Sequence, residues 1–368
     1  MMTARSTTLG ALAATALAAL ALATGASAQT GWQADWDKTL AAAKKEGEVV
    51  VAASPNPGRR NWTVAEWAKE FPDIKLSIVM VRGGEYETRV KQERAAGKYL
   101  WDVHSSGPSA VYDFIAQGYM EPLVPELILP EVKDPAPWGG WANAFYDKER
   151  KYVLAVYRDL EPIWYNAKLV PPEKVARMGA RILLAPEYKG KILWQDPRLA
   201  GGGPNFAVML YKVLGEADFR KLMVDQAPVF FTGGNQIVDA MVREKGVFFM
   251  GPILTDRLEP YEKTGMKFDM RAMGNARDVA WIGTDGVTLA VFKNRPNPNA
   301  ARVFVNWMMT RKMSLGLAQA QRMDSRRSDI ANVSGRHIAP GIDYIEPQRE
   351  ENQAEYRKVI ALIRELRP

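Results

Sequence analysis

The sequence predicts an α/β protein with two lobes, each a mostly parallel sheet with helices on both faces. Three times in the first third of the chain, a short apolar run leads into a polar loop and then a helical pattern. Repeated strand–loop–helix units fold as parallel sheets whose crossover helices cover both faces. Roughly 340 residues remain after a predicted leader, which is more than one core commonly serves, so we expect two lobes.

The first 28 residues have the features of a secretory signal peptide. Arg5 gives a positive start, Leu9–Leu22 is an apolar run rich in Ala and Leu, and Ala26-Ser27-Ala28 is a small-residue cleavage site. The apolar run is too short and too weakly apolar to span a membrane. We therefore expect a mature protein that begins near Gln29 and is exported to the periplasm.

Glycine and proline divide the first part of the mature chain into alternating helices and strands. Gly47, Pro72 and Gly118 each follow a helical pattern, and these residue types end helices. The expected order is helix Trp32–Glu46, strand Glu48–Ala53, helix Asn61–Phe71, strand Ile74–Val81, helix Tyr86–Ala96, strand Leu100–Val103 and helix Ser109–Gln117.

The second part of the chain continues in the same style after a connecting stretch rich in proline and glycine, Pro122–Trp141. A polar bend with one aromatic residue is expected over Val279–Gly286. The expected strands are Tyr152–Tyr157, Ile192–Trp194, Val247–Gly251, Phe268–Met273 and Val287–Phe292. The expected helices are one that begins at Pro204, then Gln236–Arg243, Ala300–Met309 and Ala354–Leu366.

Composition argues against several classes of protein. Without cysteine there are no disulfides and no thiolate metal sites, and only two histidines occur. The formal net charge of +7 is scattered rather than gathered in basic-aromatic clusters, which argues against nucleic-acid binding. A modest positive field favours anionic solutes. No G-x-S-x-G or H-E-x-x-H motif occurs, so we expect no enzyme, although an exported hydrolase is kept as a remote alternative.

The stretch Trp194–Phe206 is the first candidate ligand site. It combines a strand end, the glycines Gly201, Gly202 and Gly203, and a helix start with Pro204 in its first turn. Backbone N–H groups at a helix start carry partial positive charge and bind anions. Asn205 follows in the same turn, and Arg198 could bind an anion through two parallel hydrogen bonds. The alternatives are a flexible surface loop and, for Arg198, a surface salt bridge.

Polar residues at other strand ends are further candidates. In open α/β sheets, ligands bind beyond the carboxyl ends of the strands. The loops there contain Ser54, Gly83, and the pair Ser105 and Ser106. Each serine could instead cap a helix or form a turn. For His104 we favour a hydrogen-bonded structural role over metal coordination, and Asp102 is expected to serve the fold.

The chain resembles a periplasmic solute-binding protein of an ABC importer, of the bilobal type II fold and the family that includes ferric-ion binding proteins. The sequence segments on which the resemblance rests are spread over almost the whole mature chain: Trp36–Val51, Asp102–Gly107, Trp164–Val170, Asp196–Phe206 and Gly283–Trp307. The resemblance implies two α/β lobes, a ligand between them, and closure on binding. Lobe one would comprise residues 29–151 plus 279–368 and lobe two residues 152–278, with hinge crossings near Tyr152–Asp159 and Arg271–Trp281.

The resemblance also implies which residues contact the ligand. At one position the sequence differs from the ferric members of the family, and this difference argues against iron as the ligand. Ferric members use two adjacent tyrosines after a strand, where this chain has Phe248-Phe249-Met250, and no tyrosine pair occurs anywhere in it. Hard ferric iron prefers phenolate and carboxylate oxygens, so direct iron binding is disfavoured and no metal ligand is assigned. The family places the turn with Thr232 and Asn235 at the ligand, although Asn235 could simply cap its helix. Arg158 would face the cleft, and Trp281 could stack on an organic ligand or fill the hinge.

The predicted function is therefore a non-enzymatic receptor that closes two lobes over a small anion and delivers it to an inner-membrane permease. A phosphonate, a phosphate ester or an organic acid would fit, and a ferric complex is the alternative. No cofactor is expected, and we expect a monomer. The expected ligand-binding residues are Ser54, Gly83, Ser105, Ser106, Arg158, Arg198, Gly201, Gly202, Gly203, Asn205, Thr232, Asn235 and Trp281.

Overall fold

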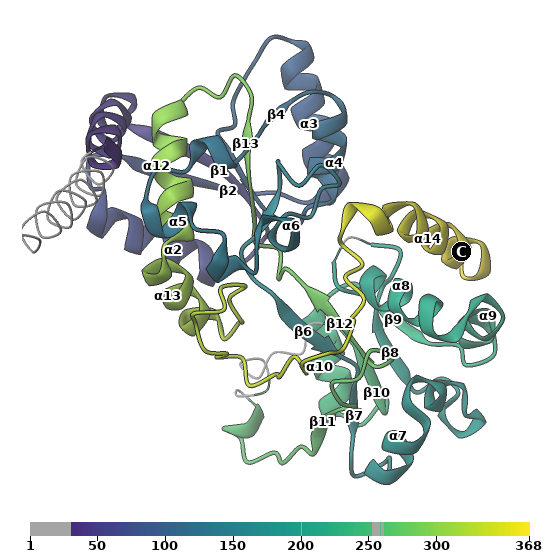
Figure 1. Cartoon of the computed structure of the whole chain (residues 1–368). Helices are drawn as coiled ribbons and strands as arrows, with labels where there is room; N and C mark the ends of the chain where they lie inside the picture. Colours follow the sequence, from purple (N-terminus) through teal and green to yellow (C-terminus); the bar gives the residue numbers. More distant parts are fainter. Residues whose placement is uncertain (1–30, 200, 252–257, 259–260) are drawn as a thin grey trace, which may run out of the picture.

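Two lobes make up the protein, and a narrow ribbon lies between them (Figure 1). The computed structural model describes residues 31–199, 201–251, 258 and 261–368, so the predicted signal peptide lies outside the described residues. In this part of the chain, no helix is both long and apolar enough to cross a bilayer.

Lobe one is built on a sheet of β1 (Glu48–Ala53), β2 (Lys75–Met80), β3 (Val103–Ser105), β4 (Met120–Glu121), β5 (Leu154–Ala155) and β13 (Thr288–Phe292). The strand order is β2–β1–β3–β13–β4, with β5 also beside β13. β1 pairs in parallel with β2 and β3, as the strand–loop–helix pattern predicts. β13 comes from far along the chain and pairs antiparallel with β3, β4 and β5.

Helices cover both faces of this sheet because its strands are apolar on both sides. Val49 and Val51 of β1 pack with α2 and α12, whereas Ala52 faces α3 and α4. The helices of lobe one are residues 31–46, α2 (Pro57–Glu70), α3 (Gly83–Ala95), α4 (Ser109–Ala116), α12 (Pro298–Met309) and α13 (Arg311–Gln321). Short turns are η1 (Val124–Glu126), α5 (Pro130–Lys133), η2 (Ala136–Trp138) and α6 (Trp141–Ala144).

Lobe two repeats this plan on a sheet of β7 (Trp164–Asn166), β8 (Ile192–Gln195), β9 (Val229–Phe231), β10 (Phe248–Met250) and β11 (Met270–Ala272). The order is β11–β7–β10–β8–β9, with β8, β9 and β10 parallel and β7 antiparallel to β10 and β11. The carboxyl ends of β8, β9 and β10 therefore share one edge. The helices are α7 (Pro172–Met178), α8 (Gly203–Leu214), α9 (Glu216–Val224), α10 (Gly234–Val242) and α14 (Gln353–Leu366), with the turns η3 (Gly179–Leu184), η4 (Pro186–Tyr188) and η5 (Glu350–Asn352).

The C-terminal helix α14 packs in lobe two, although residues 279–368 were assigned to lobe one. Val359, Leu362 and Ile363 of α14 lie in the hydrophobic cluster that contains Trp194 of β8 and Phe206 of α8. Figure 1 shows α14 beside α8. The chain therefore passes between the lobes a third time, after α13. The other lobe boundaries remain predictions.

The first two crossings form one antiparallel ribbon of β6 (Asp159–Pro162) and β12 (Ala280–Gly283), which lies between the two lobes (Figure 1). The residue pattern predicts a bend over Val279–Gly286, where the structure has strand β12. The bend prediction was wrong because β12 is extended only through its pairing with β6, more than 100 residues away in the sequence.

Most other elements occur where they are expected, with one informative shift. The helix predicted from Asn61 begins at Pro57. Pro57 occupies the first turn, where its missing N–H costs nothing, and the Asn56 side chain accepts a 2.9 Å hydrogen bond from the Arg59 N–H. The run Ser54–Gly58 is therefore a helix cap as well as a loop.

The prediction that Asp102 serves the fold is confirmed. Its carboxylate is fully buried and accepts hydrogen bonds from Val50 N (2.8 Å), Asn297 N (2.8 Å) and Asn297 Nδ2 (2.9 Å). Because Asn297 precedes α12, this one side chain joins β1 to the start of a helix from the far end of the chain.

We predict that Asp102→Ala lowers the free energy of unfolding by about 2–4 kcal/mol, because it leaves buried N–H groups unpaired. Urea denaturation followed by circular dichroism measures this change. Asp37→Ala, at an exposed helical position, is the control and should change stability by less than about 0.5 kcal/mol. Equal stability of the two variants would contradict this role for Asp102.

Candidate functional site

The β6–β12 ribbon has two chemically different faces. Residues directly opposite each other in an antiparallel ladder share a face, so Asp159 and Glu161 lie on the same side as Gly283 and Trp281. The other face carries Leu160 and is covered by Tyr344. We call the side with Asp159, Glu161 and Trp281 the hinge face.

Asp159 is the most buried carboxylate of the hinge face. Its side chain is 1% exposed, and Oδ1 accepts a 2.7 Å hydrogen bond from Asp324 N and lies 3.4 Å from Nη2 of Arg336. Oδ2 has no hydrogen-bond partner among the described residues. Burial raises the pKa of Asp159 well above its usual value, although Arg336 acts in the opposite direction.

Glu161 is half-buried and forms no hydrogen bond or ion pair with any described residue. Burial raises the pKa of its carboxyl, Arg336 lowers it, and Asp285 raises it further. Asp285 itself is exposed and pairs with Arg59 at 3.0 Å. Asp159, Glu161 and Asp285 therefore act on one another electrostatically, and two guanidinium groups, those of Arg336 and Arg59, pair with Asp159 and Asp285, so the three carboxyl groups outnumber their cationic partners.

Lobe one contributes hydroxyl groups above the hinge face. Ser54 and Ser106, which follow β1 and β3, lie 2.7 Å apart through their Oγ atoms. Thr288 Oγ1 donates to the Ser106 carbonyl at 2.6 Å. Gly286 has a positive φ of 65°, and a Cβ there would come within 2.6 Å of Ser54 Oγ, so glycine is needed for this close approach. Because Gly286 follows Asp285, the serine pair lies beside the acidic group. Ser105 is buried within β3.

Lobe two contributes the start of α8. Trp281 is 4% exposed and packs edge-on against Phe206 in the first turn of α8, with ring centroids 5.7 Å apart. Of the two roles predicted for Trp281, this packing is the hinge-filling one. Gly201, Gly202, Gly203 and Asn205 therefore start a helix that contacts the hinge ribbon. The buried Asn205 donates from Nδ2 to Gly201 O at 3.3 Å, and its Oδ1 has no partner among the described residues.

The amide groups that were expected to hold an anion already have a partner. Gln195, at the end of β8, accepts from Gly202 N (3.0 Å) and Gly203 N (3.2 Å) through Oε1. An uncharged amide oxygen thus occupies the position proposed for an anion. Space is also tight here, since a Cβ on Gly203 would come within 2.0 Å of the Gln195 carbonyl oxygen. The role of these glycines toward a ligand stays a prediction.

Arg198 lies in a salt bridge, the alternative considered for it. Its guanidinium group binds Asp196 (Nη2 to Oδ2, 2.8 Å) and donates to the carbonyl oxygens of Arg367 and Pro368 at 2.9 Å each. Arg198 therefore attaches the C-terminus to lobe two, and its guanidinium group is engaged by these three partners. Its role toward a ligand also stays a prediction.

Three further candidates are exposed at helix starts and lie in separate parts of the molecule. Gly83 begins α3 in lobe one, and Thr232 and Asn235 lie at the start of α10 in lobe two. The Gln236 side chain, not Asn235, accepts hydrogen bonds there, from Thr232 Oγ1 (3.1 Å) and Gly233 N (3.3 Å).

Arg158 precedes β6 and lines a pocket of about 400 Å³ together with residues 324–342. That pocket lies against the segment covering Leu160, on the side of the ribbon away from Glu161. The structure therefore separates Arg158 from the serine pair, the α8 start and Trp281, which surround the hinge face.

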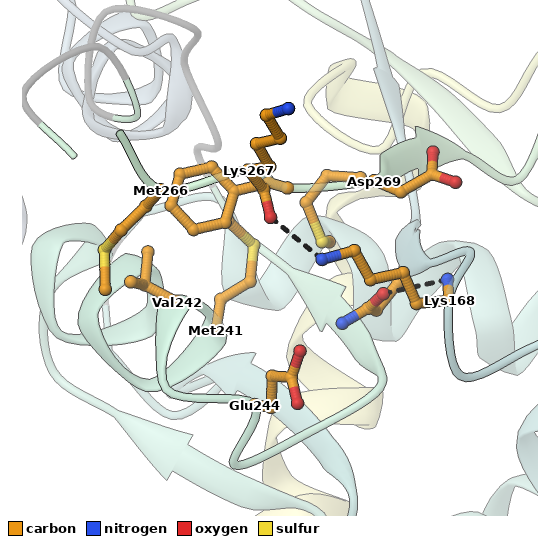
Figure 2. Close-up of a pocket in the computed structure, with 10 residues that line it drawn as sticks. Lys168, Met241, Val242, Glu244, Met266, Lys267 and Asp269 are labelled. Atoms are coloured by element: carbon orange, nitrogen blue, oxygen red, sulfur yellow. Dashed lines mark hydrogen bonds between the residues drawn. The ribbon is translucent and has the colours of Figure 1, made fainter. Parts of the chain in front are cut away.

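A second pocket, at the outer end of lobe two, is too small for an organic solute. Figure 2 shows Lys168 reaching across it and donating to the Lys267 carbonyl, near Met241 and Met266. Its volume is about 140 Å³, whereas pockets for small organic ligands usually measure roughly 300–1,000 Å³.

Five residues at or beside the hinge face were not among the expected site residues: Asp159, Glu161, Asp285, Arg336 and Gln195. The only local signal was the alternation Asp-Leu-Glu in residues 159–161, which places two carboxyl groups on one face of a strand. Arg336 comes from a segment with no regular pattern, so its pairing with Asp159 had no signal in the sequence.

His104 has the structural role favoured for it. It is 1% exposed, its Nε2 lies 3.1 Å from the Gly107 carbonyl, and its ring stacks against Tyr86. Among the described residues, no group of three or more His, Cys, Asp or Glu side chains is placed to hold a metal ion.

We predict that Gln195→Ala lowers the free energy of unfolding by about 1 kcal/mol, because the first N–H groups of α8 lose their cap. Gln195→Glu keeps an acceptor and adds a charge that the helix start favours, so it should be at least as stable as the parent. Urea denaturation of both variants checks this, and a more stable alanine variant would contradict it.

We predict that His104 makes the protein less stable in acid. Burial lowers the pKa of His104 to about 4 from its ordinary 6.5, so the unfolded chain takes up a proton before the folded one. Stability is lost as pH falls from 6.5 to 4, by up to about 3 kcal/mol at 1.36 kcal/mol per pH unit. Chemical denaturation across this range should show a shallower decrease for His104→Gln than for the parent, and parallel curves would contradict the prediction.

Comparisons with known proteins agree with the two-lobed architecture. The solved structures it resembles include iron-bound HitA from Pseudomonas aeruginosa, with 13% identity, TM-score 0.64, and coverage of 87% of this chain and 99% of that one. AfuA from Actinobacillus pleuropneumoniae, solved with fructose-6-phosphate, has 15% identity, TM-score 0.55, and coverage of 86% and 99%. The acarbose receptor GacH from Streptomyces glaucescens has 18% identity, TM-score 0.62, and coverage of 87% and 92%.

At these identities the likeness establishes the type II periplasmic binding fold and not the ligand. No curated protein sequence matches the chain. Residues 52–313, well over half of the chain, match the family described as bacterial extracellular solute-binding protein. The chain therefore belongs to this family, whose members are the solute-binding components of ABC-type transporters.

Proposed function

We propose that this protein is a periplasmic receptor that holds one small solute on the hinge face, between its two lobes, and presents it to a membrane permease. The observation that carries the proposal is the meeting of three parts there. The ribbon supplies Glu161, lobe one supplies Ser54 with Ser106, and lobe two supplies the α8 start, which Phe206 and Trp281 hold against the ribbon. A solute that contacts all three would draw the lobes together, as hinge closure requires.

The charge of the hinge face bears on the class of solute. A bound anion would meet Glu161 and Asp159, neither of which is fully balanced by a cation. Carboxylate oxygens accept hydrogen bonds, and an ionised one attracts positive charge. The geometry therefore favours a solute with an ammonium or hydroxyl group that donates to Glu161. The anionic solute predicted from the sequence is the second candidate, supported by the net charge of +7.

Other parts of the proposal follow from the sequence. Export depends on the signal peptide over residues 1–28, and the receptor acts as a monomer without a cofactor. A ferric complex remains the alternative cargo, with a bound anion supplying the oxygen ligands that the missing tyrosine pair would provide. Visible absorbance on adding ferric citrate would identify this case.

A thermal-shift screen identifies the class of solute, because a tight ligand raises the melting temperature with the logarithm of its excess over Kd. Suitable probes are 1,4-diaminobutane, choline, mannitol, glycerol 3-phosphate, succinate and ferric citrate. We predict the largest shift for an amine or polyol probe, and at least about a tenfold weaker affinity in Glu161→Gln, because the amide oxygen still accepts a hydrogen bond but the negative charge that strengthens it is lost.

Glu149→Gln is the matched control, since Glu149 is exposed in lobe one, and its affinity for the same probe should equal that of the parent. Isothermal titration calorimetry measures both variants. A response to glycerol 3-phosphate or succinate that neither Glu161→Gln nor Arg158→Gln weakens would favour the anionic candidate on the hinge face, because the pocket beside Arg158 is a separate site. If no small solute binds at all, the receptor proposal itself fails.

A further inference from the structure

A second feature of the hinge has a charge opposite to that of the hinge face. The pocket of about 400 Å³ beside Arg158 is lined by that residue and by part of the segment 324–342, including Arg326, Arg327, His337, Ile338 and Ile342. Asp324 lines it as well, and its carboxylate accepts hydrogen bonds from Val333 N, Ser334 N and Ser334 Oγ. None of its lining residues comes from the sheet or helices of lobe two, so it is distinct from the proposed solute site.

Arginine side chains outnumber carboxylate groups around this pocket. Glu346 receives Arg349 (Nε to Oε2, 3.0 Å) and Arg326 (Nη2 to Oε2, 3.3 Å). Burial raises the pKa of Glu346, but these two guanidinium groups outweigh it and hold that pKa below its usual value, with a smaller contribution from Arg158. Arg327 is separately paired with Asp329 at 2.8 Å. The Glu346 carboxylate therefore pairs with two arginines, and a third arginine lies near it.

Arg158 is that third arginine. Its backbone N–H donates to Asp324 O at 3.0 Å, which fixes where the side chain begins. The side chain is half-buried and forms no ion pair with a described residue, and its buried Nε has no hydrogen-bond partner among them. A buried N–H without a partner costs free energy, and an unbalanced charge beside it attracts an anion.

We propose that this pocket binds a small oxyanion, a carboxylate or a phosphate, through the guanidinium group of Arg158. A guanidinium group offers parallel N–H donors that match two oxygens of either group. His337 and Asn332 line the same pocket and supply further polar atoms, while Ile338 and Ile342 provide an apolar wall for the carbon chain of an organic acid.

Binding there would stabilise the hinge without touching the solute. Arg158 immediately precedes β6, and the segment 324–342 runs toward the third crossing between the lobes. An anion held by both would tie the first crossing to the third. The inference is independent of the proposed function, because it concerns a pocket that the hinge face does not share.

The test is calorimetric titration of the mature protein with sodium phosphate and with sodium succinate, at ionic strength kept constant with sodium chloride. We expect binding of at least one of these anions at a single site, with a raised melting temperature. Arg158→Gln should weaken that binding at least about tenfold through loss of a charge-assisted bidentate contact. Arg177→Gln, an exposed arginine on α7, should bind as the parent does.

Two further variants keep the test decisive. Asn332→Asp changes an exposed residue of the pocket by a near-isosteric substitution, so it should fold even if Arg158→Gln does not, and its added negative charge should weaken anion binding severalfold. Glu161→Gln should leave anion affinity unchanged, because Glu161 lies on the other face of the ribbon. The inference is overturned if neither anion binds beyond the sodium chloride control. It is also overturned if Asn332→Asp binds like the parent, or if Glu161→Gln weakens anion binding as much as the Arg158 variant does.

Discussion

The buried ion pair between Asp159 and Arg336 is the interaction on which the hinge depends. Asp159 begins the first crossing between the lobes, and Arg336 comes from the segment that leads to the third. The same carboxylate accepts from the Asp324 backbone, and β12 donates from Ile282 N to Ile345 O at 3.0 Å. All three crossings are therefore joined at one place. Removing one partner of such a pair leaves an uncompensated buried charge, which usually costs about 3–5 kcal/mol.

The alternation of a strand gives this hinge its two sides. Asp159 and Glu161 point one way and Leu160 the other, so the carboxyl groups gather on the side that faces the serine pair and α8. Arg158 lies near the arginines around Glu346 on the other side. Neither the excess of carboxyl groups on the hinge face nor the excess of arginines on the other side is balanced by neighbouring groups of opposite charge. Since a ligand can shift a conformational equilibrium only through differential binding, unbalanced groups at the hinge are well placed to couple binding to lobe movement.

The glycine stretch 201–203 has the geometry of an anion site, but its N–H groups bind a side chain of the protein itself. Its N–H groups do converge at a helix start, which is the arrangement that binds anions. In this chain Gln195 Oε1 accepts hydrogen bonds from two of these N–H groups, so the start of α8 is capped. Phe206 in the same helix turn packs against Trp281. The first N–H groups of α8 require an acceptor, and the protein supplies it from its own strand.

The sequence alone determined most of the elements, because apolar periodicity, glycine and proline act locally, and its resemblance to a known family indicated the two-lobed α/β plan. It also named Ser54, Ser106 and Trp281 as candidates, and these follow or lie within strands near the hinge, while their contact with a ligand stays a prediction. Only the tertiary structure decided that α14 packs in lobe two, that β12 is a strand, and that Arg198 anchors the C-terminus. Each of these depends on a partner more than 100 residues away, and the charge of a site is likewise a sum over such distant partners, which no local pattern contains.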